Sequence, residues 1–120
     1  MSDHIYWILA VKINEGEQDN FKNLMNEMIE TVQRDEPGAL NYEWSIGEDG
    51  RTCHIYERYA DCDATMAHMS SFGKMYAKKF VSLSRVMGIT VYGTPDETVK
   101  GALSAMGPVY LSPIGGFNRF

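Results

Sequence analysis

Two residues of this sequence combine the chemistry of proton transfer with a spacing that could bring them together. His68 follows Ala67 in a segment of helical character, and Glu57 lies earlier in a segment of strand character. An unperturbed imidazole titrates at roughly pH 6.5, so it can exchange a proton at neutral pH. A buried carboxylate needs a partner, and it can orient an imidazole and raise its basicity. We therefore predict that His68 is a catalytic base and that Glu57 supports it.

Both residues also have structural interpretations. His68 could lie on the inward face of its helix and bond to a backbone or tyrosine group without taking part in any reaction. Glu57 could form a salt bridge, for example with Arg58, at the rim of a barrel. A metal site is not expected, because His4, His54 and His68 do not have the spacing of metal ligands.

Several aromatic residues accompany this pair along the chain. Small-molecule sites are mostly apolar with a few placed polar groups, so flat aromatic walls would suit a planar substrate. The same side chains could instead belong to the core or to a subunit interface. The aromatic residues that we expect to contact a substrate are Trp44, Tyr42, Tyr59, Phe72, Phe80 and Tyr92.

The elements that must position these groups can be predicted from hydrophobic periodicity. Residues 5–13 are rich in β-branched and aromatic side chains and predict a strand. Both faces of this strand are apolar, so we expect helices to cover one and a partner subunit to cover the other. Residues 17–34 carry apolar side chains at helical spacing, and Pro37-Gly38 ends that helix.

The next two strands form a predicted hairpin, over residues 40–46 and 52–59 with a turn signal between them. The loop length leaves two registers open, and a shift of one residue moves every side chain to the other face. In one register Trp44 lies on the same face as Glu57, and in the other it lies with Tyr56. The sequence does not decide between them.

The remainder predicts two helices, a fourth strand and a tail. Asp61 or Asp63 can cap a helix over about residues 64–71, and helical spacing continues over residues 76–87. Residues 89–93 predict the fourth strand. A short helix then begins at Pro95-Asp96, and the tail from Gly107 to Phe120 is too apolar to stay in water. The tail could pack on its own subunit, or it could cover a neighbour or a pocket mouth.

The order of these elements predicts an α+β fold, a ferredoxin-like antiparallel sheet with helices on one face. We expect one domain over residues 1–120, with a core at about 4–94 and a helix plus an extended tail over 95–120. A net charge of -5 makes nucleic acid an unexpected partner. No apolar run is long enough for a membrane helix, and the cytoplasm is the expected compartment. Cys53 and Cys62 are expected to be reduced thiols.

The middle of the chain holds a set of short motifs: Pro37-Gly38, Tyr42-Glu43-Trp44, Glu57-Arg58-Tyr59-Ala60-Asp61, Ala64 and Ala67-His68. Together they resemble the antibiotic biosynthesis monooxygenase family, within the group of dimeric α/β barrels. The resemblance implies that two ferredoxin-like units pair their sheets into a homodimer. It also implies a monooxygenase that needs no cofactor and uses dioxygen on a small phenolic, quinol or polycyclic aromatic molecule.

The resemblance leaves other functions open, because one fold supports many activities. A non-catalytic dimer that binds an aromatic metabolite or responds to stress is the main alternative, and an isomerase or hydrolase-like activity is a third. Haem degradation is not expected. That branch of the group uses an Asn on the first strand and a Trp in the helix region, but residues 6–12 hold no Asn and residues 60–72 hold no Trp.

Overall fold

The computed structural model describes residues 2–119, so Met1 and Phe120 at the two ends of the predicted domain lie outside the described residues. The elements follow one another in this order: β1 (Ile5–Ile13), α1 (Gln18–Asp35), β2 (Ala39–Ile46), β3 (Thr52–Tyr59), α2 (Cys62–Met75), α3 (Ala77–Leu83), β4 (Ser84–Gly93), α4 (Glu97–Leu103), the short 3₁₀ helix η1 (Ser104–Met106) and β5 (Val109–Leu111).

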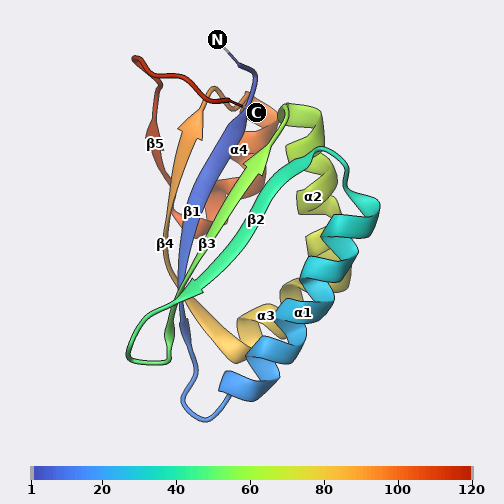
Figure 1. The fold of residues 1–120 in the computed structure, drawn as a ribbon, viewed down its shortest axis with the longest axis vertical. Coiled ribbons are helices and arrows are strands. Elements are labelled where there is room, and N and C mark those ends of the chain that lie inside the picture. The colour runs from blue at the N-terminus through green and yellow to red at the C-terminus, as the bar shows by residue number, and fades with distance from the viewer. Residues whose placement is uncertain (1, 120) are drawn as a thin grey trace.

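The five strands form one sheet in the order β2-β3-β1-β4-β5, with β1 at its centre (Figure 1). The pairs β2–β3, β1–β3 and β1–β4 are antiparallel, whereas β5 runs parallel to β4. The predicted α+β ferredoxin-like arrangement is confirmed. The sheet is mixed rather than wholly antiparallel, because the tail contributes a strand that its sequence did not reveal.

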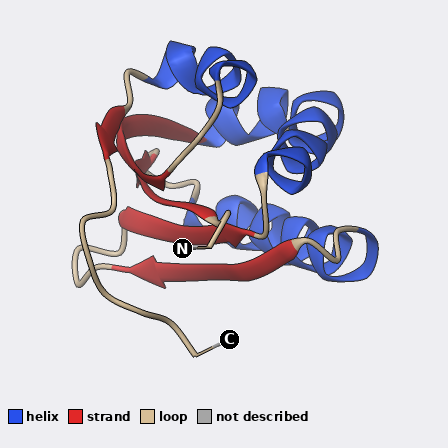
Figure 2. Cartoon of the chain, turned by 90° about the horizontal axis from the view of Figure 1, so that it is seen from above, coloured by secondary structure: helices blue, strands red, loops and turns tan. Residues whose placement is uncertain are grey.

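The helices lie on one side of the sheet (Figure 2), and the core lies between the two layers. Strand β1 sends alternate side chains into this core, and all five are buried: Ile5, Trp7, Leu9, Val11 and Ile13. The other face of β1 is apolar as well, and Ile8 on that face is 38% exposed. Cover of this second face by a partner subunit therefore remains a prediction.

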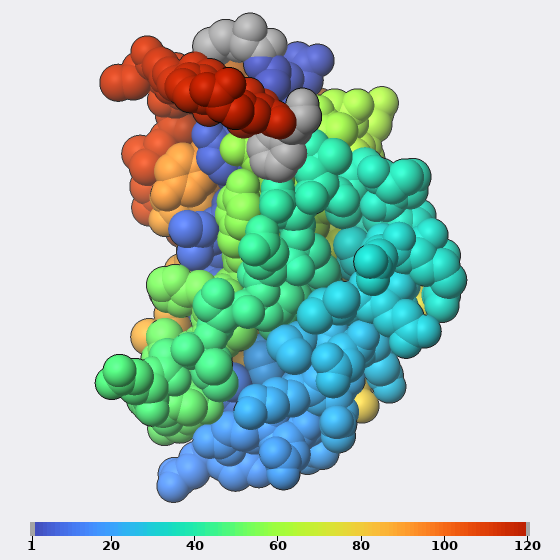
Figure 3. Space-filling view, viewed as in Figure 1, coloured from blue at the N-terminus to red at the C-terminus, as the bar shows by residue number. Residues whose placement is uncertain are grey.

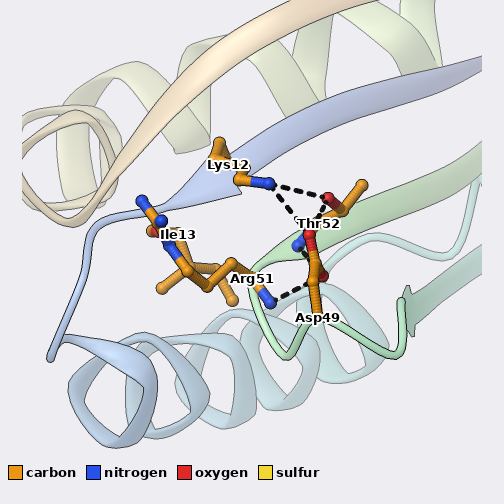
Figure 4. A network of polar contacts seen from close by, with 5 residues as sticks. All are labelled: Lys12, Ile13, Asp49, Arg51 and Thr52. Atoms are coloured by element: carbon orange, nitrogen blue, oxygen red, sulfur yellow. Dashed lines mark hydrogen bonds and ion pairs between the residues drawn. The ribbon is translucent and has the colours of Figure 1, made fainter.

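The turn between β2 and β3 is held by one carboxylate (Figure 4). Oδ1 of Asp49 accepts hydrogen bonds from the backbone N–H groups of Arg51 and Thr52 at 2.9 and 2.8 Å. Its Oδ2 accepts from the Thr52 hydroxyl and from Lys12 on β1. These hydrogen bonds, those of the side chains first, hold the pKa of Asp49 well below its ordinary value. The turn thus fixes the loop length that the sequence left open.

Strand β4 begins earlier than its sequence suggests. Helical spacing over residues 76–87 predicted a helix, but α3 ends at Leu83 and Ser84 already pairs with Ile13 of β1. The long β1 offers partners to the whole of β4, and this non-local pairing outweighs the local pattern. A register shift between Ala10 and Val11 absorbs the irregularity in this ladder.

The tail adds a short edge strand and then leaves the sheet. Residues Val109, Tyr110 and Leu111 pair with Thr90, Val91 and Tyr92 of β4. Beyond this strand Phe117 is 81% exposed, and the tail lies on the surface away from the helices (Figures 2 and 3). No helix within residues 2–119 is both long and apolar enough to span a bilayer.

Candidate active site

A cavity of about 460 Å³ lies between the inner face of the sheet and the helical layer. Few of the residues that line this cavity are polar, and none of them is Lys or Arg. The lining residues are Trp7, Leu9, Met28, Tyr42, Ile55, Glu57, Met66, His68, Met69, Ser70, Phe72, Gly73, Ala77, Phe80, Val81, Val86, Ala102 and Met106. A volume of this size suits a small organic molecule.

The hairpin register places the carboxylate of this site. Tyr42 pairs with Glu57, and Glu57 pairs in turn with Trp7 of β1, so the three side chains share the inner face of neighbouring strands. The structure therefore selects the register in which Trp44 and Glu57 lie on the same face. Glu57 is only 4% exposed.

Helix α2 places the histidine. Asp61 caps this helix, because its carboxylate accepts a hydrogen bond from the Ala64 N–H at 2.8 Å. The helix continues through Gly73 to Met75, longer than predicted. His68, two turns from the cap, is 5% exposed and its ring stands 5.0 Å from that of Tyr59, between centroids.

His68 lies between two carboxylates. Its Nδ1 is 2.8 Å from Oε1 of Glu36, the residue that ends α1, and its Nε2 is 3.2 Å from Oε1 of Glu57. The Tyr59 hydroxyl donates a hydrogen bond of 2.6 Å to the same oxygen of Glu57. Four side chains, from the C-cap of α1, from α2 and from β3, thus form one buried polar network, which we call the Glu36–His68–Glu57 triad with Tyr59 attached.

This geometry sets the charge of the imidazole. Burial alone lowers the pKa of His68, but the hydrogen bonds to Glu36 and Glu57 outweigh it and raise the pKa to about 9. A neutral ring would turn a lone pair toward one of the carboxylates, whereas the imidazolium donates from both nitrogens. His68 is therefore positively charged at neutral pH.

The two tyrosines of the site remain phenols. Burial first, and then the charges of Glu57 and Glu36, raise the pKa of Tyr42 well above its ordinary value. Burial and Glu57 do the same to the pKa of Tyr59. Both hydroxyls are therefore hydrogen-bond donors throughout the physiological range.

The structure brings together only part of the predicted substrate-binding set. Tyr42, Phe72 and Phe80 line the cavity, and Tyr59 packs beneath His68 without lining it. Trp44 contacts the edge of Tyr42 but faces a separate cavity of about 140 Å³.

Tyr92 is turned to the opposite face of the sheet. It pairs with Tyr6 of β1, and the two rings stack there at 5.2 Å between centroids. Tyr92 therefore cannot contact a ligand in the cavity of its own subunit.

Sequence reasoning missed Glu36. This residue lies 32 positions from its partner His68, so no motif spacing connects the two. A carboxylate directly before Pro37-Gly38, at the end of an amphipathic helix, was the only available signal. Four methionines that the sequence analysis did not place in the site also line the cavity: Met28, Met66, Met69 and Met106.

Residues 2–119 contain no group of three or more His, Cys, Asp and Glu side chains arranged to hold a metal ion. The two cysteines are free thiols, and burial raises the pKa of Cys53 to about 11. The groups near the cavity that we consider for proton transfer are therefore the triad together with Tyr42 and Tyr59.

The comparison with protein families gives one match. The model described as antibiotic biosynthesis monooxygenase matches residues 5–81, which is more than half of the chain. No curated protein matches the chain.

Solved structures resemble the whole chain or its core. MupZ from Pseudomonas fluorescens is 25% identical with a TM-score of 0.86, and the match covers 99% of this chain and 91% of MupZ. SnoaB from Streptomyces nogalater, described as a cofactor-independent oxygenase, is 14% identical with a TM-score of 0.66, covering 79% and 96%. A conserved protein from Methanosarcina mazei is 16% identical with a TM-score of 0.64, covering 76% and 92%. The last two likenesses concern the fold.

Proposed function

The chain belongs to the antibiotic biosynthesis monooxygenase family, and from this membership we propose that it is a cofactor-independent monooxygenase of a small phenolic or quinol molecule. The observation that carries the proposal is the contact between Glu57 and His68 in the wall of an apolar cavity. The likeness of fold to SnoaB, a cofactor-independent oxygenase, supports the same reaction class.

We propose roles for the two residues that are the reverse of those predicted from the sequence. His68 already carries its proton, so it is a poor base at neutral pH. Glu57 lines the cavity, and the Tyr59 hydroxyl and the His68 ring both contact its Oε1. We assign the proton acceptor to Oε2 of Glu57, and His68 to holding and orienting that carboxylate.

A substrate with an activated methylene group, such as an anthrone, shows how the atoms and electrons of this reaction balance. Its enol proton passes to Glu57, and the resulting anion gives one electron to dioxygen. The two radicals combine into a carbon–oxygen bond, and the peroxide takes the proton back from Glu57. Loss of the second carbon-bound hydrogen with cleavage of the oxygen–oxygen bond releases water and leaves a ketone. The sum is R₂CH₂ + O₂ → R₂C=O + H₂O, with no outside reductant.

The test is oxygen uptake by the purified protein. With anthrone or a hydroquinone as substrate and a chelator present, we expect uptake above the uncatalysed rate, and one dioxygen per anthrone converted to anthraquinone. The chelator should leave the rate unchanged. Binding of these compounds without any increase in oxygen uptake would contradict the proposal.

That contrary result would favour the second candidate, a dimer that binds an aromatic metabolite without transforming it. The scarcity of polar groups in the cavity supports this candidate, since among its lining residues only Trp7, Tyr42, Glu57, His68 and Ser70 carry a polar side-chain atom. Product formation that needs no dioxygen would instead indicate an isomerase or hydrolase-like activity in the same cavity.

We further propose that the protein is a homodimer that pairs through the outer face of the sheet. Tyr6 and Tyr92 stack on this face beside the partly exposed Ile8, and Arg58 covers the Tyr6 ring at 3.9 Å from its centroid. Light scattering at micromolar concentration should give twice the mass of one chain, and Ile8→Glu should shift the protein toward one chain. A single-chain mass for the unmodified protein would contradict the interface.

A further inference from the structure

Two solvent-accessible polar atoms of the site, the Tyr42 hydroxyl and Oε2 of Glu57, have no hydrogen-bond partner among residues 2–119, since the hydrogen bond from Tyr59 and the contact from His68 both go to Oε1. The indole Nε1 of Trp7, which also lines the cavity, has no partner either, but it is fully buried. Neither the Tyr42 hydroxyl nor Oε2 of Glu57 belongs to the fully buried polar atoms that lack a partner, so both retain accessible surface. Both residues line the cavity and pair across β2 and β3. A donor and an acceptor therefore stand side by side in its wall.

The same wall is negatively charged. An imidazolium between two carboxylates leaves one net negative charge in the triad, and no cavity-lining residue is Lys or Arg. Arg58, the buried arginine of β3, is turned to the outer face, where it bonds the Tyr56 hydroxyl and covers Tyr6. A charge in such an apolar setting is weakly screened, so an anionic ligand would be repelled.

The rest of the cavity offers no further polar recognition. Apart from Ser70 and the buried indole nitrogen of Trp7, the other walls are apolar, and four flexible methionines are among them. Thioether side chains adapt to the shape of an apolar ligand rather than impose one. Selectivity in this cavity therefore rests on the donor–acceptor pair and on the charge behind it.

We propose that the cavity selects neutral, hydroxyl-bearing apolar molecules and rejects their carboxylates, with Tyr42 donating to the ligand oxygen and Glu57 accepting its proton. A hydroxyl group satisfies both atoms at once, because its oxygen accepts and its hydrogen is donated. An ammonium group would suit the charge but offers no lone pair to Tyr42. This inference rests on the proposed function in one respect, because it takes the bound hydroxyl-bearing molecule to be the substrate.

The proposal also explains how a negative site can support the formation of a substrate anion. The neutral molecule enters beside a triad with one negative charge. When its proton moves to Glu57, the ligand becomes negative and the triad becomes neutral. The total charge of the cavity stays the same, so the proton transfer requires no added buried charge.

The experiment compares three probes by calorimetry under nitrogen at pH 7, where no oxidation can occur. They are 1-naphthol, 1-naphthoate and 1-methoxynaphthalene, which share one apolar body. We expect 1-naphthol to bind about tenfold or more tightly than either of the others, because 1-naphthoate meets the charge and 1-methoxynaphthalene cannot donate to Glu57.

Variants separate the two parts of the recognition. Tyr42→Phe should weaken 1-naphthol about tenfold, and Glu57→Gln should improve 1-naphthoate relative to 1-naphthol, because it removes the charge but keeps the shape. Glu43→Gln removes the same charge from the outer side of β2, where Glu43 accepts a hydrogen bond from Asn41. This control should change neither the affinity of 1-naphthol relative to 1-naphthoate nor its affinity relative to 1-methoxynaphthalene.

Equal binding of 1-naphthol and 1-naphthoate would overturn the inference, and so would no binding of 1-naphthol at millimolar concentration. An affinity ratio of 1-naphthol to 1-naphthoate that stays unchanged in Glu57→Gln would also overturn it. These results are independent of oxygen chemistry. Selective binding without oxygen uptake would refute the monooxygenase proposal alone, and oxygen uptake with equal binding of naphthol and naphthoate would refute this inference alone.

Discussion

Glu57→Gln should lower kcat/KM for oxygen uptake by about 100-fold to 10,000-fold, the range typical for loss of a general base. The amide oxygen can still accept the hydrogen bond from Tyr59, so the network keeps its shape while Oε2 loses its capacity for a proton. The measurement is initial rates of oxygen uptake with anthrone over a range of concentrations. The change should lie mainly in kcat, because the amide retains most ground-state contacts.

Two comparisons make this result specific. Glu43→Gln, on the same hairpin but on the outer face, should keep the full rate. His68→Gln should also lose activity, since the carboxylate would no longer be held by an imidazolium, and the pH profile of the remaining activity should change. A loss confined to His68→Gln, with Glu57→Gln fully active, would return the base role to the histidine.

The free energy of unfolding should fall by about 3 kcal/mol as pH rises from 6 to 10, through the titration of His68 alone. The pKa of this buried residue is about 9 in the folded protein, against about 6.5 for an unperturbed imidazole. A group whose pKa is raised on folding stabilises fully below its unfolded pKa and loses that contribution as pH passes the folded pKa. The loss should therefore occur between about pH 6.5 and 9, as the imidazolium between Glu36 and Glu57 deprotonates.

Urea unfolding at several pH values measures this effect, with His68→Gln as the reference. Cys53 and other groups also titrate at alkaline pH, but they are present in both proteins and cancel in the difference. Wild type should exceed the variant most at pH 6, and the gap should close toward pH 10. A gap that stays constant over this range would show that His68 is not charged in the folded protein.

Local sequence patterns predicted most of the fold. Strand β1 follows from its β-branched and aromatic content, and helix α1 follows from apolar side chains that recur every third and fourth residue. The start of β4 and the parallel β5 did not follow, since both depend on pairing with strands far away in the chain. In residues 84–88 helical spacing and strand pairing competed, and the partner strand decided.

The candidate site was half predictable. His68 and Glu57 stood out by residue type, but their contact depends on a hairpin register that Asp49 fixes from outside the site. Glu36 lies at the end of helix α1 and contacts His68. A single polar residue before a turn is too common in sequences to mark a functional site. The presence of Glu36 changes the chemistry, because a second carboxylate turns the expected base into a cation.

The central place of β1 has a consequence for synthesis on the ribosome. The first strand to emerge pairs with β3 and β4, and its last partner, Gly93, lies opposite Ile5. Until residue 93 has left the exit tunnel, Ile5 and Trp7 cannot be buried as they are in the finished sheet. The nascent chain therefore carries an uncovered apolar segment from the synthesis of β1 until residue 93 emerges, and chaperones that hold extended apolar segments can bind it throughout that interval.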